Sequence, residues 1–203
     1  MKKLLSILMT VLMFLILVPT NVFAEESISD YVNINSNNIT VSEPMTYDEI
    51  VEKYSNDTGI PIEEAREIFD NQLKSYGIAQ TRAAGDRYIT ISTEIEVTNA
   101  YFPTVNFYCY VNSDSHYGFI REVLNVSIDT DFNGTSYFFD GSIYFNLEDP
   151  TTIYYLVNGN WYKTGGGLSF SIGNSVASFG LSFSSEHYAY SYIEDRLNWG
   201  FLG

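Results

Sequence analysis

Oxygen-bearing side chains occur at the spacing of a calcium loop in residues 129–134, with the sequence DTDFNG, and at Asp140. Carboxylate and amide oxygens at alternate positions converge on a hard cation when a glycine permits a sharp turn, and the twelfth position completes the shell. The spacing predicts weak calcium binding by Asp129, Asp131, Asn133 and Asp140. A plain hairpin turn is the alternative, because Asp, Asn and Gly also favour turns.

Outward-facing tyrosines form a second candidate site. Tyr108 and Tyr110 alternate with apolar residues, so on a strand they point away from the core, and Tyr88 and Tyr144 lie on equivalent rows. An exposed tyrosine offers a rigid flat ring and a hydroxyl, which suit a sugar ring or a protein partner. These four residues are the predicted ligand-binding site. Burial beneath a second layer or beneath the N-terminal helices is the alternative.

The serine-rich stretch 167–184 alternates small polar side chains with apolar ones. This alternation is similar to that of the membrane-inserting hairpin of β-pore-forming toxins, and it supports a second function, a secreted membrane-active effector or toxin. The arms indicated by the sequence are shorter than the roughly 9–11 residues that a membrane-spanning strand needs. A hairpin within a soluble sandwich is therefore the favoured interpretation.

Residues suited to catalysis are few. His116 lies in a polar turn and His187 at the start of a strand, where both are expected to be solvated. The sequence contains no G-x-S-x-G, no H-E-x-x-H and no glycine-rich phosphate loop followed by lysine. No catalytic residue is predicted, and a hydrolase is the third-ranked function. Two pairs of neighbouring acids, considered for glycoside hydrolysis, have the pattern of solvent-facing charges: Glu94 with Glu96, and Glu148 with Asp149.

Hydrophobic periodicity indicates the elements that position these residues. Short runs of alternating apolar and polar residues, separated by turns, predict an antiparallel β-sandwich of about seven to nine strands over residues 88–203. We predict a central hairpin at 124–147 and another at Asn158-Gly159, a dipeptide typical of two-residue turns. Cys109, the only cysteine, lies on an apolar row and is predicted to be buried and inert.

Residues 45–77 predict a short αα-hairpin that precedes the β-domain. Thr46 and Glu49 form a capping box, and apolar residues follow at helical spacing in two segments separated by Gly59. Two such helices cannot bury their apolar stripes alone, so we expect them to dock on the β-domain and to cover part of an outer tyrosine row. The hairpin is either a permanent part of the fold or a pro-region removed by cleavage in the linker 78–87.

Both segments of this hairpin carry a resemblance. Residues 45–51 (MTYDEIV) and 59–65 (GIPIEEA) resemble the N-terminal helical region of small exported Gram-positive bacterial proteins of unknown function. In those proteins an all-β segment follows the helices. The resemblance therefore implies a fold and no functional residue.

The N-terminus and the charge bound the compartment and the partners. Residues 1–24 have a basic start, a short apolar core and small residues before a cleavage point at Ala24, which predicts a signal peptide and a secreted product without a transmembrane segment. Residues 25–44 are polar and are predicted to be a disordered leader. Loss of the two N-terminal lysines leaves eight basic against 25 acidic residues, a net charge of −17, which argues against nucleic acid as a partner.

Together these patterns predict a secreted, non-catalytic binding module that holds a glycan or a cell-surface protein through exposed tyrosines. Calcium is the one cofactor that the sequence suggests. A membrane-active effector and a hydrolase are the two alternatives.

Overall fold

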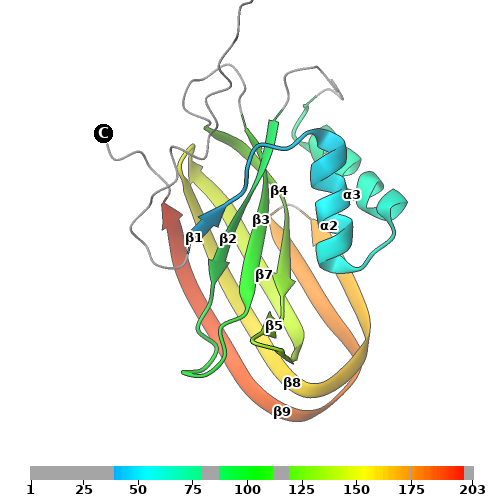
Figure 1. Cartoon of the computed structure of the whole chain (residues 1–203), viewed down its shortest axis with the longest axis vertical. Helices are drawn as coiled ribbons and strands as arrows, with labels where there is room; N and C mark the ends of the chain where they lie inside the picture. The colour runs from blue at the N-terminus through cyan, green and yellow to red at the C-terminus, as the bar shows by residue number, and fades with distance from the viewer. Residues whose placement is uncertain (1–38, 79–86, 112–118, 174, 199–203) are drawn as a thin grey trace, which may run out of the picture.

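The computed structural model describes residues 39–78, 87–111, 119–173 and 175–198 (Figure 1). Over these residues the protein is mainly β with one helical hairpin, which confirms the predicted fold class. The predicted signal peptide (1–24) and residues 79–86 of the predicted linker lie outside the described residues. The elements of the described chain are β1 (Ile39–Val41), α2 (Tyr47–Thr58), α3 (Ile62–Ser75), β2 (Arg87–Glu94), β3 (Thr104–Val111), β4 (Ile120–Asp129), β5 (Asp131–Phe132), β6 (Thr135–Ser136), β7 (Phe138–Asp149), β8 (Thr152–Gly173) and β9 (Val176–Asn198).

The strands of the described chain pair antiparallel and form three sheets. β1, β2, β3 and β4 lie side by side in that order, and β5 and β6 form a short hairpin of their own. The third sheet closes on itself, because β7 pairs with β8 along most of its length and also with β9, through Gly141–Tyr144 opposite Val176–Phe179. The β8–β9 hairpin is long enough to bend and to bring its end back to β7 (Figure 1).

The predicted leader contains a strand. β1 pairs with β2 through Ile39 opposite Thr93 and Val41 opposite Ile91. The prediction of disorder is therefore wrong for residues 39–41, and residues 25–38 lie outside the described chain. A three-residue edge strand carries little sequence signal, because its backbone only has to pair with a strand that is already in place.

One apolar core lies between the four-stranded sheet and the closed sheet. The predicted period-two rows of β3 and β7 face this core. Phe107 of β3 is fully buried, and its ring centre lies 5.5 Å from that of Tyr155 on β8. Trp161 is also fully buried, and its ring centre lies 4.8 Å from that of Phe139 on β7.

The helical hairpin packs on the opposite face of the four-stranded sheet (Figure 1). Thr46 and Glu49 form the predicted capping box at the start of α2, and Gly59 ends that helix with a left-handed φ of 72°. Most of the predicted stripe is buried, whereas Ile62, the first residue of α3, is 40% exposed. The buried stripe residues are Tyr47, Ile50, Val51 and Tyr54 of α2 and Ala65, Phe69 and Leu73 of α3.

Two of the predicted hairpins are not formed. β4 and β7, predicted to pair with each other over 124–147, belong to different sheets, and the chain passes between them through the β5–β6 hairpin. Each strand alternates with period two because it presents one face to the same core, and that pattern does not distinguish strands that pair from strands that pack face to face. Asn158 and Gly159, predicted to form a turn, lie inside the continuous strand β8.

Gly159 serves close packing instead of a turn. It lies opposite Gly141 on β7, and a Cβ built on it would be 2.6 Å from the carbonyl oxygen of Asp140 and 2.6 Å from the ring of Phe139. The Phe139 ring therefore lies directly against the backbone of β8 at Gly159, and a side chain at position 159 would displace the ring.

We expect Gly159→Ala to destabilise the protein, because the added Cβ has no space and overpacking of this kind costs about 1–3 kcal/mol. Thermal unfolding followed by near-ultraviolet circular dichroism should show a lower Tm. Gly173→Ala is the matched control, since nothing lies within 4 Å of its added Cβ, and it should not lower the Tm. Equal melting temperatures for the two variants would contradict the close packing at Gly159.

Candidate functional site

The four predicted ligand-binding tyrosines lie in two different environments. Tyr88, Tyr108 and Tyr110 are 2%, 0% and 8% exposed, because α2 and α3 lie over them. The prediction that these three side chains are exposed is wrong, and the alternative, burial beneath the N-terminal helices, is confirmed. The physical reason is the apolar stripe of the helices, which is stable only when it is packed on another surface. Tyr144, on the closed sheet, is 39% exposed.

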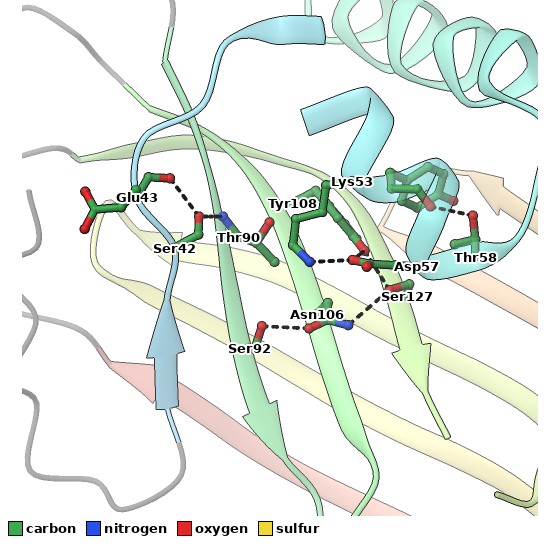
Figure 2. A network of polar contacts seen from close by, with 11 residues as sticks. Ser42, Glu43, Lys53, Asp57, Thr58, Thr90, Ser92, Asn106, Tyr108 and Ser127 are labelled. Carbon is green, nitrogen blue, oxygen red and sulfur yellow. Dashed lines mark hydrogen bonds and ion pairs between the residues drawn. The ribbon is translucent and has the colours of Figure 1, made fainter. Parts of the chain in front are cut away.

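A chain of polar contacts joins α2 to the buried Tyr108 (Figure 2). The Tyr108 hydroxyl donates to Oδ2 of Asp57 at 2.5 Å and lies 2.9 Å from the hydroxyl of Ser127 on β4. The same Asp57 oxygen lies 2.8 Å from Nζ of Lys53, one helical turn away. Asn106 of β3 donates from Nδ2 to the hydroxyl of Ser127 at 3.4 Å, which adds a second contact between β3 and β4. These contacts fix the helix on the sheet.

Burial sets the acid–base state of the groups on β3. Desolvation, with the neighbouring Asp57 carboxylate, raises the pKa of Tyr108. Desolvation raises the pKa of the Cys109 thiol, which lies on the inner face of the same strand, and the prediction of a buried cysteine is confirmed. Both groups are protonated at neutral pH, so neither is a ready nucleophile.

Tyr144 belongs to a larger surface, the outer face of β7, β8 and β9. Tyr190 and Tyr192 project from the same side of β9 and are 57% and 59% exposed. We call this surface the outer tyrosine face, and it consists of Tyr144, Tyr154, Asn158, Asn160, Tyr190 and Tyr192 with their neighbours. Three adjacent rows cross the strands in register: Tyr144–Leu156–Glu194, Ser142–Asn158–Tyr192 and Asp140–Asn160–Tyr190.

The polar groups of the outer tyrosine face hold one another in position. The Tyr190 hydroxyl donates to Oδ1 of Asn158 at 2.8 Å, and Nε2 of His187 lies 3.2 Å from Oδ1 of Asn160. Each amide also carries two N–H donors. The face therefore combines aromatic rings with amide groups of fixed orientation.

An ion pair lies at one end of the outer tyrosine face. Arg196 donates from Nε and from one terminal nitrogen to the two oxygens of Glu148, at 2.8 and 3.0 Å. The guanidinium lies 5.0 Å from the ring centre of Tyr154, and that ring is 5.9 Å from the ring of Tyr144. The positive charge of Arg196 is thus compensated within the protein.

Tyr190 and Tyr192 were not predicted as site residues, although they are the most exposed tyrosines of the described chain. In the sequence, tyrosines alternate with alanine and serine around these two positions, and this pattern does not indicate whether the tyrosines or the small residues face the core. The structure resolves this with Ser191, which is 4% exposed and accepts a hydrogen bond from Nε1 of Trp161 at 2.9 Å. The small polar side chain faces the core, and the tyrosines face outward.

The acids considered for hydrolysis have structural partners or are exposed. Asp149 accepts hydrogen bonds from the backbone N–H and the hydroxyl of Thr151, both at 2.8 Å, and these lower its pKa. Asp149 and Glu122 both line a groove of about 490 Å³, and burial raises the pKa of Glu122. The pKa of Asp149 is lowered by hydrogen bonds within its own turn and that of Glu122 is raised by burial. Because neither carboxyl group causes the pKa shift of the other, the two do not form an acid–base pair. Glu94, at the end of β2, and Glu96, just after it, are exposed, and Glu148 is paired with Arg196. His116 lies outside the described residues.

The predicted calcium loop is a hairpin turn. Asp129 accepts from the backbone N–H of Asp131 at 2.9 Å, Asp131 accepts from that of Gly134 at 3.1 Å, and Asn133 has a left-handed φ of 54°. These are the turn-building bonds of the alternative interpretation. Asp140 lies in β7, and in the described part of the chain no three His, Cys, Asp or Glu side chains gather as a metal site would require. The predicted convergence of the ligands is not formed.

The serine-rich hairpin is longer than the sequence suggests. β8 and β9 have 22 and 23 residues, so the argument from short arms is wrong. Its end is held by the core, where the rings of Phe170 and Phe179 lie 5.2 Å apart. Leu168 and Phe183 nevertheless remain 71% and 61% exposed. Among the residues that the structure describes, no helix is long and apolar enough to cross a membrane.

Comparison of the chain with protein-family models, with curated proteins and with solved structures finds no match.

We expect Tyr108→Phe to weaken the docking of the helices. Without the hydroxyl, the half-buried Asp57 carboxylate loses a charge-assisted hydrogen bond, which costs about 1.5–3 kcal/mol. Denaturant unfolding measures this loss. Tyr190→Phe, which removes a hydroxyl that donates at the surface, should change the free energy of unfolding by less than about 0.5 kcal/mol. Similar losses of unfolding free energy for the two variants would contradict the claim that the polar contacts in Figure 2 hold the helices on the sheet.

The buried tyrosines predict alkaline unfolding. Desolvation raises the pKa of Tyr155 to about 12, and it raises that of Tyr108 as well. Because these values exceed the value of about 10 for an unfolded tyrosine, the unfolded state binds fewer protons above pH 10, and stability falls as pH rises. Absorbance at 295 nm should show late tyrosine ionisation together with loss of near-ultraviolet circular dichroism. Ionisation of every tyrosine near pH 10, with the native spectrum retained, would contradict the burial.

Proposed function

We propose that this protein is a secreted, non-catalytic binding module that holds a glycan on its outer tyrosine face. The observation that carries the proposal is the pair of Tyr190 and Tyr192, more than half exposed on one side of β9, with Tyr144 exposed on β7. Large exposed aromatic side chains beside fixed polar groups are the usual components of a binding surface.

The dimensions of the face suit an extended ligand. Tyr190 and Tyr192 are two residues apart on one strand, a separation of about 7 Å. Tyr144 lies two strands away from Tyr192 and one row along, and because strands are about 4.8 Å apart the two positions are separated by about 12 Å. Asn158 lies between them on β8. Rings at these separations can stack on successive sugar units, while the amides bond to hydroxyl groups between them.

Charge narrows the class of glycan. Asp140 and Glu194 lie on the outer tyrosine face, and Arg196 is already paired with Glu148. The whole chain has a formal net charge of −15. A neutral glycan, or one that carries amino groups, fits this field better than a sulfated or phosphorylated one. Secretion, the context in which such a glycan is met, is supported by the signal-peptide pattern of residues 1–24.

Binding of the secreted protein to insoluble glucan, chitin and peptidoglycan tests this proposal. We expect at least one of these polymers to retain the protein, and the double variant Tyr190→Ala/Tyr192→Ala to bind at least about 10-fold more weakly, since hot-spot aromatics contribute more than about 1 kcal/mol each. Leu168→Ala is the matched control, because it removes a side chain that is 71% exposed outside the face.

Two outcomes would overturn the proposal. The first is retention that does not change in the double tyrosine variant. The second is the absence of retention together with dye release from liposomes that Phe183→Ala abolishes, which would support the membrane-active alternative instead.

A further inference from the structure

The sheet face beneath the helical hairpin contains polar atoms without partners. Asn125 of β4 is fully buried, and in the described structure neither its Oδ1 nor its Nδ2 makes a hydrogen bond. The hydroxyls of Thr90 on β2 and Tyr54 on α2 are buried and unbonded in the same way. Buried polar groups without partners are rare, because each loses its hydrogen bonds to water.

The composition of this face differs from that of the inner face of the same sheet. The inner row of β3 is Val105, Phe107, Cys109 and Val111, which is apolar throughout. The covered face alternates with it and carries tyrosines, amides and hydroxyls. Its residues are Tyr88, Thr90, Ser92, Asn106, Tyr108, Tyr110, Asn125 and Ser127, together with Leu124. Tyrosines and amides are also the components of the outer tyrosine face, but here the helical hairpin covers them.

The cover is a unit with its own ion pairs. Lys53 pairs with Asp57 within α2, and Arg66 of α3 pairs with Asp48 of α2, both at 2.8 Å. Side-chain hydrogen bonds join this unit to the sheet at Tyr108 and at Tyr76, whose hydroxyl lies 3.4 Å from the carbonyl oxygen of Val123. Just before α2, Met45 exchanges two backbone hydrogen bonds with Tyr88 of β2, at 2.7 and 2.9 Å, so the cover stays tethered at that end when the helices open. Two short helices are unstable alone, so a loss of docking would unfold them locally while leaving the sheets paired.

One end of the covered face is open. Tyr110 lines the groove of about 490 Å³ together with Ile78, the residue that follows the hairpin, and Phe119, which is 37% exposed. A ligand can therefore touch the edge of the covered face before the helices move.

We infer that the helical hairpin is a detachable cover over a second ligand-binding face, formed by Tyr88, Tyr108 and Tyr110 with Asn106 and Asn125. The ligand class is a neutral saccharide, because rings and amides without a compensating charge suit hydroxyl groups. Release of the hairpin gives the unpartnered amide of Asn125 and the hydroxyl of Thr90 water or ligand as partners. This inference is independent of the outer tyrosine face, because it rests on the opposite sheet.

Hydrogen exchange on the whole protein tests whether the cover opens. We expect the amides of α2 and α3 to exchange together and at least 100-fold faster than those of β3, since they open without global unfolding. Exchange of the helices at the rate of β3 would overturn the inference, because the hairpin would then open only when the whole protein unfolds.

Binding tests whether the face beneath the cover holds a ligand. In a Tyr190→Ala/Tyr192→Ala background, Val51→Asp places a charge in the buried stripe, and Ile62→Asp is the matched control at a position that is 40% exposed. The probes are soluble hexasaccharides of β-1,4-linked glucose and of N-acetylglucosamine. We expect Val51→Asp to bind one of them at least 10-fold more tightly than the control does, and Tyr88→Ala/Tyr110→Ala to reverse the gain.

The state of the β-domain is read from Cys109, which is fully buried and should resist thiol reagents as long as the sheets remain packed. A folded Val51→Asp variant that binds no more tightly than the Ile62→Asp control overturns the second face. If Val51→Asp exposes Cys109, hydrogen exchange of the unaltered protein with each hexasaccharide decides instead. Faster exchange in the helices with the probe present supports the inference, and unchanged exchange contradicts it.

Discussion

The structure depends on one constraint, that the apolar face of every layer must be covered by another layer. The four-stranded sheet covers its inner face with the closed sheet and its outer face with the helical hairpin (Figure 1). The closed sheet has one apolar face, which packs in the shared core, and its outer face is exposed to water. The bend of β8 and β9 makes this possible, because it brings the end of a long hairpin back to β7. The close contact of Gly159 with Gly141 and Phe139 lies in the same closed sheet.

This constraint produces two tyrosine surfaces of similar chemistry and opposite exposure. Tyr108 is buried because an amphipathic helix has no other surface on which to pack, and Tyr192 is exposed because no described element packs on β9 from outside. Exposure of an aromatic residue on a sheet is thus decided by the element that covers the sheet and not by the strand itself. The proposed glycan site follows from the face that remains open, and the inferred second site from the unpartnered atoms on the face that is closed.

Local patterns in the sequence were sufficient for the helices and for the buried rows of most strands, and insufficient for their arrangement. The capping box at Thr46 and Glu49, the buried stripe of α2 and the inner row of β3 were all predicted from spacing, because each depends on neighbours along the chain. The pairing of β4 with β7 was predicted wrongly, since alternation reports which face is buried and not which strand lies alongside. Asn158-Gly159 misled for a related reason: glycine suits both a turn and a close approach of two backbones. The outer tyrosine face was found only at Tyr144, because the inward position of Ser191 is set by Trp161, thirty residues away.

Ligand binding on the outer tyrosine face can be observed residue by residue, by nuclear magnetic resonance of the protein with isotope-labelled tyrosine rings. The rings are assigned by single Tyr→Phe substitutions, and the spectrum is followed during titration with a hexasaccharide of the polymer that retains the protein. We expect the resonances of Tyr190, Tyr192 and Tyr144 to shift first and to saturate together, while that of Tyr101, fully buried in the core, stays in place. Saturable binding that leaves Tyr190 and Tyr192 unchanged would contradict this expectation.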